Sequence, residues 1–360
     1  MREISAVDNE NTKNLQVDSW RMFQLMKFMA REDHPFHKFS TGNAETLDKM
    51  PKDHGLEIRK LLLDFYEKHY SANMMKFTVY GKESLDTLQA WATERFGSIV
   101  NKDLQRLQVP SDPYTPLRLQ KIIEVVPVKD LKCLDFYFPI PEVESLYETK
   151  PTRYINHLLG HESDGSILSA LKSRGYANGL SSFLSQSFAD FASLGISIEL
   201  TDAGVLAVEE IIECVFAYIG MLRREGPKDW IAQEVKDVAD MNFRYVSKTE
   251  PSSYATSLAN NMQIYPSDKI ISGASLVFKI DLGEVERIMT FLSPQNCMAV
   301  IRHKGVASRA TKKEEWYGTK YTDFSFTSEQ QIKWGELSTA SGSQQSTWSS
   351  LLRLPQVVLR

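Results

Sequence analysis

The sequence predicts an α+β protein in which helices pack on mostly antiparallel sheets. Apolar residues between Val205 and Leu222 recur three or four positions apart, which is the spacing of an amphipathic helix. Ile196, Ile198 and Leu200 alternate with polar residues, as in a half-buried strand. The pattern of elements restarts after residues 105–116, which carry three prolines among polar residues, so we expect two domains in this chain of 360 residues.

Before this linker the sequence predicts three helices and a strand. Glu3–Ala30 has the helical spacing throughout and predicts one long helix, and an amphipathic pattern predicts a second helix over 56–71. Met74–Tyr80 is rich in strand formers and predicts a short strand. Ser84 can cap a helix that runs to Phe96.

Beyond the linker, helices and strands alternate. Strands are predicted at 122–126, 134–138, within 183–200 and at 298–301, and helices at 152–161, 167–174, from Thr201 to Leu222, and at 228–246. A polar turn with Asn before an apolar strand occurs at both 71–79 and 293–301, which suggests a duplication whose first copy has lost its beginning. The Ser/Thr/Gln-rich tail, 338–360, is predicted to be divergent or disordered, or to come from a misread reading frame.

Charge and composition narrow the class of protein. A net charge of −4 argues against nucleic acid or an anionic membrane as partner, and no apolar stretch is long enough to span a bilayer. The three cysteines are far apart, which favours reduced thiols over a disulfide framework. The N-terminal residues resemble no signal peptide, and the last three residues are not a peroxisomal address, so we expect a cytoplasmic protein.

Two groups of residues could carry chemistry. His157 and His161 are four apart on a predicted helix and could share a face, but Leu158 stands where a zincin motif has glutamate. Such a pair is more often structural, although an unrelated metal protein that combines these histidines with Glu162 stays an alternative. Glu3 and Glu10 lie two helical turns apart on one face, which by itself indicates a solvated acidic surface.

Several ordered segments identify a resemblance. The chain is similar, over residues 1 to about 337, to the insulysin branch of the M16 zinc metallopeptidases, in these segments: 20–25, 34–43, 70–73, 138–141, 157–162, 165–166, 225–227 and 314–319. The resemblance implies tandem M16-type (LuxS/MPP-like) domains. Residues 1–104 would be the C-terminal half of a catalytic domain, 105–116 a linker and 117–337 a second, inactive domain.

The resemblance also implies roles for particular residues. M16 enzymes bind zinc through an H-x-x-E-H helix and a later glutamate, and the zinc-activated water hydrolyses peptides. Glu10 matches that zinc ligand, and Glu3 matches a carboxylate behind it that orients a ligand histidine. H-x-x-E-H itself is absent, so no catalytic residue is present and the isolated chain is expected to be inactive.

A second set of matching positions belongs to the family's exosite, which holds the N-terminus of a peptide substrate away from the zinc. These positions are His157, Gly160 and Glu162, followed by Leu180, Ser182 and Leu184. A strand edge can pair with any peptide backbone, and a carboxylate can bind the terminal ammonium. Ser182 and Leu184 stand where relatives often carry glycine and a polar residue, and these positions could instead only pack a helix onto a strand.

We therefore expect a piece of an insulysin-like zinc metalloendopeptidase that degrades small peptides, truncated at both ends. The alternative is a non-catalytic M16 scaffold that binds peptides or pairs with another M16 chain or with itself. As half of a domain, residues 1–104 should expose core-facing apolar side chains such as Trp20, Phe23 and Leu62 and make the isolated chain poorly soluble.

Overall fold

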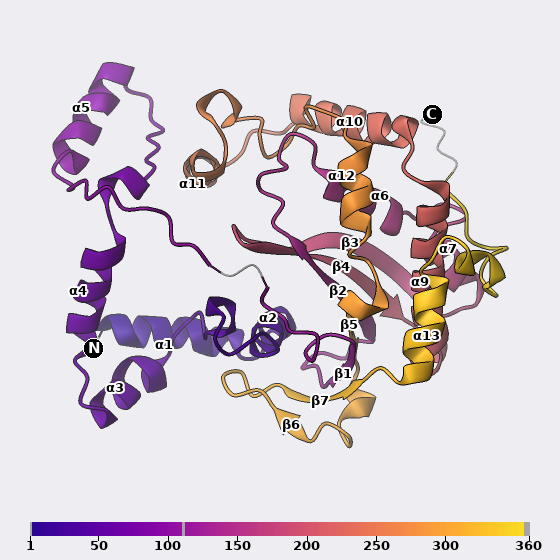
Figure 1. Cartoon of the computed structure of the whole chain (residues 1–360). Coiled ribbons are helices and arrows are strands. Elements are labelled where there is room, and N and C mark those ends of the chain that lie inside the picture. The colour runs from indigo at the N-terminus through magenta and orange to yellow at the C-terminus, as the bar shows by residue number, and fades with distance from the viewer. Residues whose placement is uncertain (1, 110–111, 356–360) are drawn as a thin grey trace. The chain divides into compact units, whose positions relative to one another are not determined.

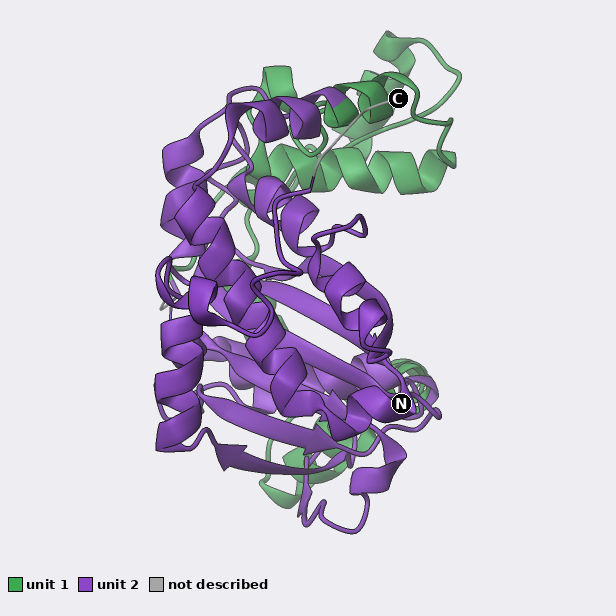
Figure 2. Cartoon of the chain, turned by 90° about the vertical axis from the view of Figure 1, so that its right-hand side faces the viewer, with its two compact units in different colours: residues 1–12, 41–108, 238–276 green, residues 13–40, 109–237, 277–360 purple. Residues whose placement is uncertain are grey.

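The computed structural model describes residues 2–109 and 112–355, so parts of the predicted linker and tail lie outside the described residues. The chain divides into two compact units, coloured in Figure 2. Unit 1 comprises residues 1–12, 41–108 and 238–276, and unit 2 comprises 13–40, 109–237 and 277–360. Each unit is assembled from separate stretches of the chain, and the predicted boundaries at 104, 117 and 337 remain predictions.

Unit 2 is built on one seven-stranded sheet in the order β3-β4-β2-β5-β1-β7-β6 (Figure 1). The strands are β1 (Lys121–Val125), β2 (Cys133–Pro141), β3 (Ala177–Ser187), β4 (Phe191–Leu200), β5 (Met298–Arg302), β6 (Lys312–Lys313) and β7 (Lys320–Ser325). Only the β1–β5 pair is parallel among the pairings of this sheet, and the rest are antiparallel. The predicted α+β class with a mostly antiparallel sheet is confirmed.

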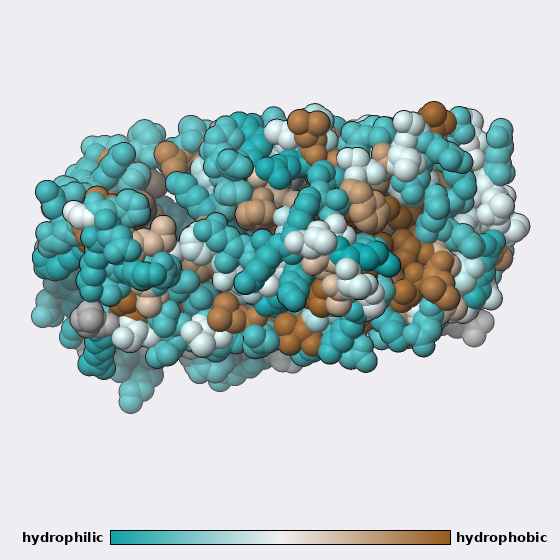
Figure 3. All heavy atoms as spheres, turned by 90° about the horizontal axis from the view of Figure 1, so that it is seen from below, coloured by the Kyte–Doolittle hydropathy of each residue, from teal (hydrophilic) through white to brown (hydrophobic). Residues whose placement is uncertain are grey.

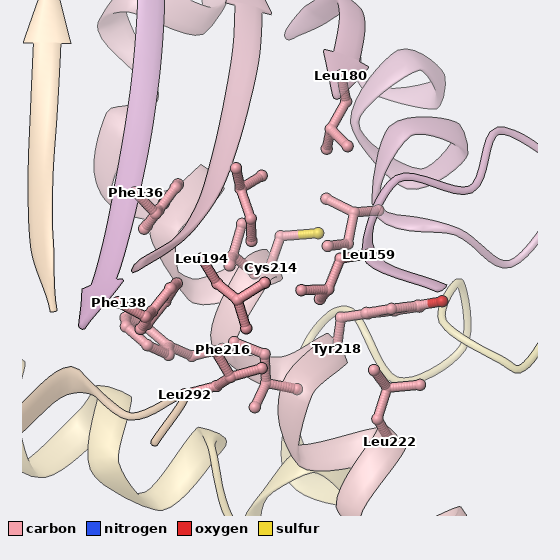
Figure 4. Close-up of a cluster of buried hydrophobic side chains, with 14 of the residues drawn as sticks. Phe136, Phe138, Leu159, Leu180, Leu194, Cys214, Phe216, Tyr218, Leu222 and Leu292 are labelled. Atoms are coloured by element: carbon pink, nitrogen blue, oxygen red, sulfur yellow. The ribbon is translucent and has the colours of Figure 1, made fainter. Parts of the chain in front are cut away.

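Helices bury the main hydrophobic core against one face of this sheet. They are α6 (Pro151–Leu159), α7 (Ile167–Ser173), α8 (Asp202–Leu206), α9 (Val208–Glu225), α10 (Asp229–Arg244), α12 (Leu282–Met289) and α13 (Ser328–Leu337). Phe216 of α9 stands edge-on to Phe136 and Phe138 of β2, with ring centroids 6.3 Å apart in both pairs (Figure 4). The periodic apolar residues of the sequence thus form the contact between α9 and the sheet.

The opposite face of the sheet carries a smaller core under helix α2 (Asp18–Phe28). Leu25 and Met26 of this helix are buried with Ile123 of β1 and Val300 of β5. Both faces of the sheet are therefore covered where β1 and β5 lie, which explains the nearly continuous burial of these two strands.

Unit 1 is helical and has little core of its own. Its helices are α1 (Arg2–Asn14, which continues beyond residue 12), the π-helix Glu45–Lys49, α3 (Met50–Asp53), α4 (Ile58–His69), α5 (Leu85–Phe96) and α11 (Pro251–Ile264). Among its described residues, Leu88 and Ala239 are the buried hydrophobic ones, whereas Leu62 is 58% exposed. Across the whole described chain, hydrophobic residues reach the surface in several patches, some of which are seen in Figure 3.

The long helix predicted over 3–30 is wrong, because the chain forms α1 and α2 with a break at Leu15–Val17. The side chain of Asp18, at the start of α2, accepts hydrogen bonds from the backbone N–H groups of Val128 and Lys129, at 2.8 and 2.9 Å. Since this anchor comes from residues more than a hundred positions away, the helical periodicity could not show the break. Likewise, the helix predicted from Thr201 is divided at Ala207 into α8 and α9.

The strand predicted at Met74–Tyr80 is also absent from the described structure. Ala72–Met74 form a 3-10 turn followed by a segment without regular secondary structure, whereas the similar turn at Pro294–Asn296 leads into the paired strand β5. The two segments begin alike, but a strand requires a hydrogen-bonding neighbour, which only the second one has here.

The tail differs from the disorder predicted for 338–360. Within its described part, to residue 355, Trp348 is fully buried and Leu352 is 5% exposed, and both belong to the main core. The Arg174 side chain stacks over the Trp348 ring at 3.7 Å from its centroid. Trp20, expected to be exposed, is 40% exposed, but Phe23 packs against the smaller core.

Candidate functional site

The C-terminal end of helix α6 meets the edge strand β3 in unit 2. Helix α6 starts at Pro151, which is favourable in the first turn of a helix, and buries Tyr154, Ile155, Leu158 and Leu159 in the core. It ends at Leu159 with Gly160 as its C-cap, so the predicted helix end at His161 is two residues late. Because these apolar residues are buried in the core, α6 has a fixed orientation, and His157 lies on its less buried face.

Gly160 permits the close approach of helix and strand. A Cβ atom at this position would lie 3.0 Å from the carbonyl oxygen of Asn156 and 3.3 Å from the backbone nitrogen of Ser182. The Ser182 hydroxyl donates a hydrogen bond of 2.8 Å to the side-chain oxygen of Asn156. Gly160 and Ser182, both predicted site residues, are therefore neighbours, and Asn156 joins them although sequence reasoning missed it.

Strand β3 is one of the two edge strands of the sheet, and β6 is the other. Within the described residues no strand pairs with its outer side, so its outward N–H and C=O groups have no ladder partner. Leu180, Ser182 and Leu184 pair with Ile198, Ile196 and Leu194 of β4, respectively, and share the face that packs on the helices. Irregularities between Ala177 and Gly179 and between Leu184 and Gln186 bracket this regular stretch.

The two histidines at the end of α6 touch each other but do not form a metal site. Their ring centroids are 5.2 Å apart and nearly perpendicular, and Nδ1 of His161 accepts the N–H of Ser163 at 3.1 Å. Nε2 of His157 is buried and has no hydrogen-bond partner in the described structure. In the part of the chain that is described, no group of three or more His, Cys, Asp or Glu residues could hold a metal ion.

Burial determines the electrostatics of this pair. Desolvation lowers the pKa of His157, and desolvation together with the neighbouring His157 ring lowers the pKa of His161. Both imidazoles therefore favour the neutral form near neutral pH. Glu162, just after the helix, is exposed to solvent.

Glu3 and Glu10 lie in unit 1, on helix α1, and both are exposed. The helix is continuous between them, so their spacing of two turns places them on one face. No His or Cys completes a metal-binding group with Glu10 among the described residues. These two carboxylates alone do not fit a zinc site, which in catalytic centres has three protein ligands.

Comparison with known proteins identifies the class. Residues 58–238, half of the chain, match the family described as "Peptidase M16 inactive domain", and residues 243–356 match "Middle or third domain of peptidase_M16". The chain therefore belongs to the M16 peptidase family, as the sequence resemblance predicted.

The curated relatives point to one branch of this family. The chain is 40% identical over 334 residues to "Insulin-degrading enzyme-like 1, peroxisomal" of Arabidopsis thaliana, covering 93% of this chain and 34% of that protein. It is 38% identical over 333 residues to the insulin-degrading enzyme of Homo sapiens, covering 92% and 33%. The chain thus spans about a third of the length of these relatives.

Solved structures show the same fold. The crystal structure of pitrilysin superimposes with a TM-score of 0.87 at 26% identity, covering 99% of this chain and 36% of that chain. The first half of the periplasmic protease PqqL from Escherichia coli has the same fold, with a TM-score of 0.60 at 14% identity and 84% and 67% coverage.

Proposed function

We propose that this chain is the peptide-holding part of an insulin-degrading-type zinc metalloendopeptidase. The observation that carries the proposal is the unpaired edge of β3 beside the end of α6. An extended peptide can add to this edge as a further strand, because main-chain hydrogen bonds do not depend on the peptide's sequence. Glu162 would bind the peptide's terminal ammonium, and His157, Gly160, Leu180, Ser182 and Leu184 would form the surrounding surface.

The Ser182 hydroxyl is already used within the protein. It donates a hydrogen bond to the side-chain oxygen of Asn156 and so connects β3 to α6, and it is not free to bind a peptide. Nε2 of His157 is buried without a partner, so a bound peptide could satisfy this polar atom once the imidazole turns toward the surface. Ligand preference at this surface would therefore come from His157, Glu162 and the strand backbone.

For the catalytic half of the function, we propose that Glu10 is a zinc ligand and Glu3 its supporting carboxylate. Histidines from outside the described residues would have to complete the site, and zinc would supply an activated water for hydrolysis. Since the residues present do not form a zinc site by themselves, the chain alone should bind peptides without cleaving them.

A second candidate, suggested by the description "inactive domain" of the matching family, is a non-catalytic scaffold that pairs with another M16 chain or with a second copy. Light scattering with and without peptide would show such self-association.

The proposed location is the cytoplasm. No helix among the described residues is long and apolar enough to cross a membrane.

The test uses a peptide with a C-terminal fluorophore and measures its affinity for the chain by fluorescence anisotropy. We expect binding to weaken when alternate amides of the peptide are N-methylated, because this removes the donors of an added strand. Acetylating the peptide's N-terminus should weaken binding to the wild-type chain but not to Glu162→Gln.

Glu286→Gln is the matched control, since Glu286 is an exposed carboxylate on α12 in the helical layer. Equal affinity for the N-methylated and unmodified peptides would refute strand addition at β3.

A further inference from the structure

A cavity of about 620 Å³ lies beside the candidate site, where strands β2 and β3 begin and β4 ends. The part of its lining that concerns the edge strand comes from Gly179 and Ser181 of β3, with Ser197 and Glu199 of β4 behind them. Gly179 and Ser181 alternate with Leu180 and Ser182 along β3, so they lie on the face of the strand opposite the helices.

Glu199 reaches toward the free edge of the sheet in this cavity. It pairs with Gly179 across the β3–β4 ladder, and its carboxylate oxygen Oε2 lies 3.4 Å from where a Cβ of Gly179 would be. Because Gly179 has no side chain, the carboxylate extends over β3 without obstruction. Glu199 is exposed, and its carboxylate makes no ion pair or hydrogen bond within the described structure.

The other charges around the cavity are largely neutralised. Lys132 forms an ion pair of 2.6 Å with Asp202. On the neighbouring strand β2, the Asp135 carboxylate faces the same side of the sheet and accepts hydrogen bonds from Arg302 and from the Ser197 hydroxyl. Glu199, with the exposed Asp130 at the rim, therefore gives the cavity a net negative charge.

We infer that this cavity receives a lysine or arginine side chain of the peptide that pairs with the β3 edge. The inference rests on the proposed function and names a substrate class for it: extended peptides with a cationic residue at one fixed position. Side chains of an added strand alternate between the two faces of the sheet, so every second one falls on the face of Gly179 and Glu199.

The reach is sufficient for this contact. An added strand lies about 4.8 Å from β3, the usual spacing of neighbouring strands. The Glu199 carboxylate already lies over β3, so a lysine of the added strand has to bridge roughly one such spacing, which its four methylene groups can do. Gly179, which has no side chain, and the small side chain of Ser181 leave this path open.

The experiment places one lysine at successive positions of an otherwise neutral peptide and compares its affinity with that of the same peptide carrying norleucine. Fluorescence anisotropy gives the ratio of dissociation constants for each position. At one position we expect lysine to bind about two- to fivefold tighter, the effect of one exposed ion pair, and the advantage should shrink in high salt.

Variants then assign the effect to Glu199. Glu199→Gln should abolish the preference for lysine without changing affinity for the norleucine peptide, and Glu199→Lys should favour a glutamate peptide instead. Glu286→Gln, with the same loss of charge elsewhere, should leave the preference intact. Gly179→Val should also remove the preference, because its side chain fills the path to Glu199.

The outcomes separate the two proposals. Equal binding of lysine and norleucine peptides at every position, or a lysine preference that persists in Glu199→Gln, would overturn the inference while peptide binding at β3 stands. Failure of the wild-type chain to bind any of the peptides would overturn both.

Discussion

The buried ion pair between Asp135 and Arg302 joins strands β2 and β5 in the sheet of unit 2. Asp135 is 2% exposed, and its two oxygens accept hydrogen bonds from Nε and one terminal nitrogen of Arg302, at 2.5 and 3.0 Å. The Ser197 hydroxyl donates a third hydrogen bond to it at 2.5 Å. The neighbouring carboxylate raises the pKa of Arg302 despite its burial.

Arg302→Met removes the charged partner and leaves the buried carboxylate with Ser197 alone. We expect this single change to lower the free energy of unfolding of unit 2 by about 3–5 kcal/mol, the usual cost of an unpaired buried charge. Asp135→Val should also destabilise, because it leaves the guanidinium buried without its carboxylate. The double variant should recover to within roughly 1.5 kcal/mol of the wild type, since two apolar side chains then replace the pair.

Urea unfolding followed by tryptophan fluorescence measures this cycle. Five of the six tryptophans, all but Trp91, belong to unit 2, so the fluorescence reports mainly on the unit that contains the ion pair. The cycle should give a coupling free energy of at least about 2 kcal/mol between the two positions. If the losses in free energy of unfolding of the two single variants add up to the loss in the double variant, Asp135 and Arg302 are not energetically coupled and the reasoning is refuted.

Two further predictions concern other parts of unit 2. Burial lowers the pKa of His157 below its usual 6.5, so the folded state favours the neutral imidazole. The contribution of this ring to the free energy of unfolding is therefore fully present above pH 6.5 and is lost as the pH falls through the lowered pKa. We expect His157→Gln to reduce the loss of thermal stability between neutral and acidic pH, and an unchanged slope would contradict this. Trp348→Ala should cost about 3–5 kcal/mol in the urea experiment, because it empties a fully buried position in the tail. A cost near zero would mean that the tail is not part of the core.

The local pattern of the sequence determined most elements of unit 2. Apolar residues at helical spacing marked α6 and α10 within a few residues, and also most of α9, although not its start, because one face of each helix has to be buried. Alternation of Ile196, Ile198 and Leu200 marked the end of β4, but the sequence placed strands only within 183–200, whereas β3 already begins at Ala177. The ordered motifs identified the M16 family, which the comparisons confirm.

Only the tertiary structure decided the features that depend on partners far apart in the chain. The break before Asp18 depends on the amides of Val128 and Lys129, and the segment after Met74 lacks a neighbouring strand in the described chain. The register of β3 against β4 placed Gly179 under Glu199, although each residue is unremarkable in sequence. Local propensity shows which backbone form a segment favours, but hydrogen bonds and charges between distant segments determine whether it pairs, breaks or forms a site.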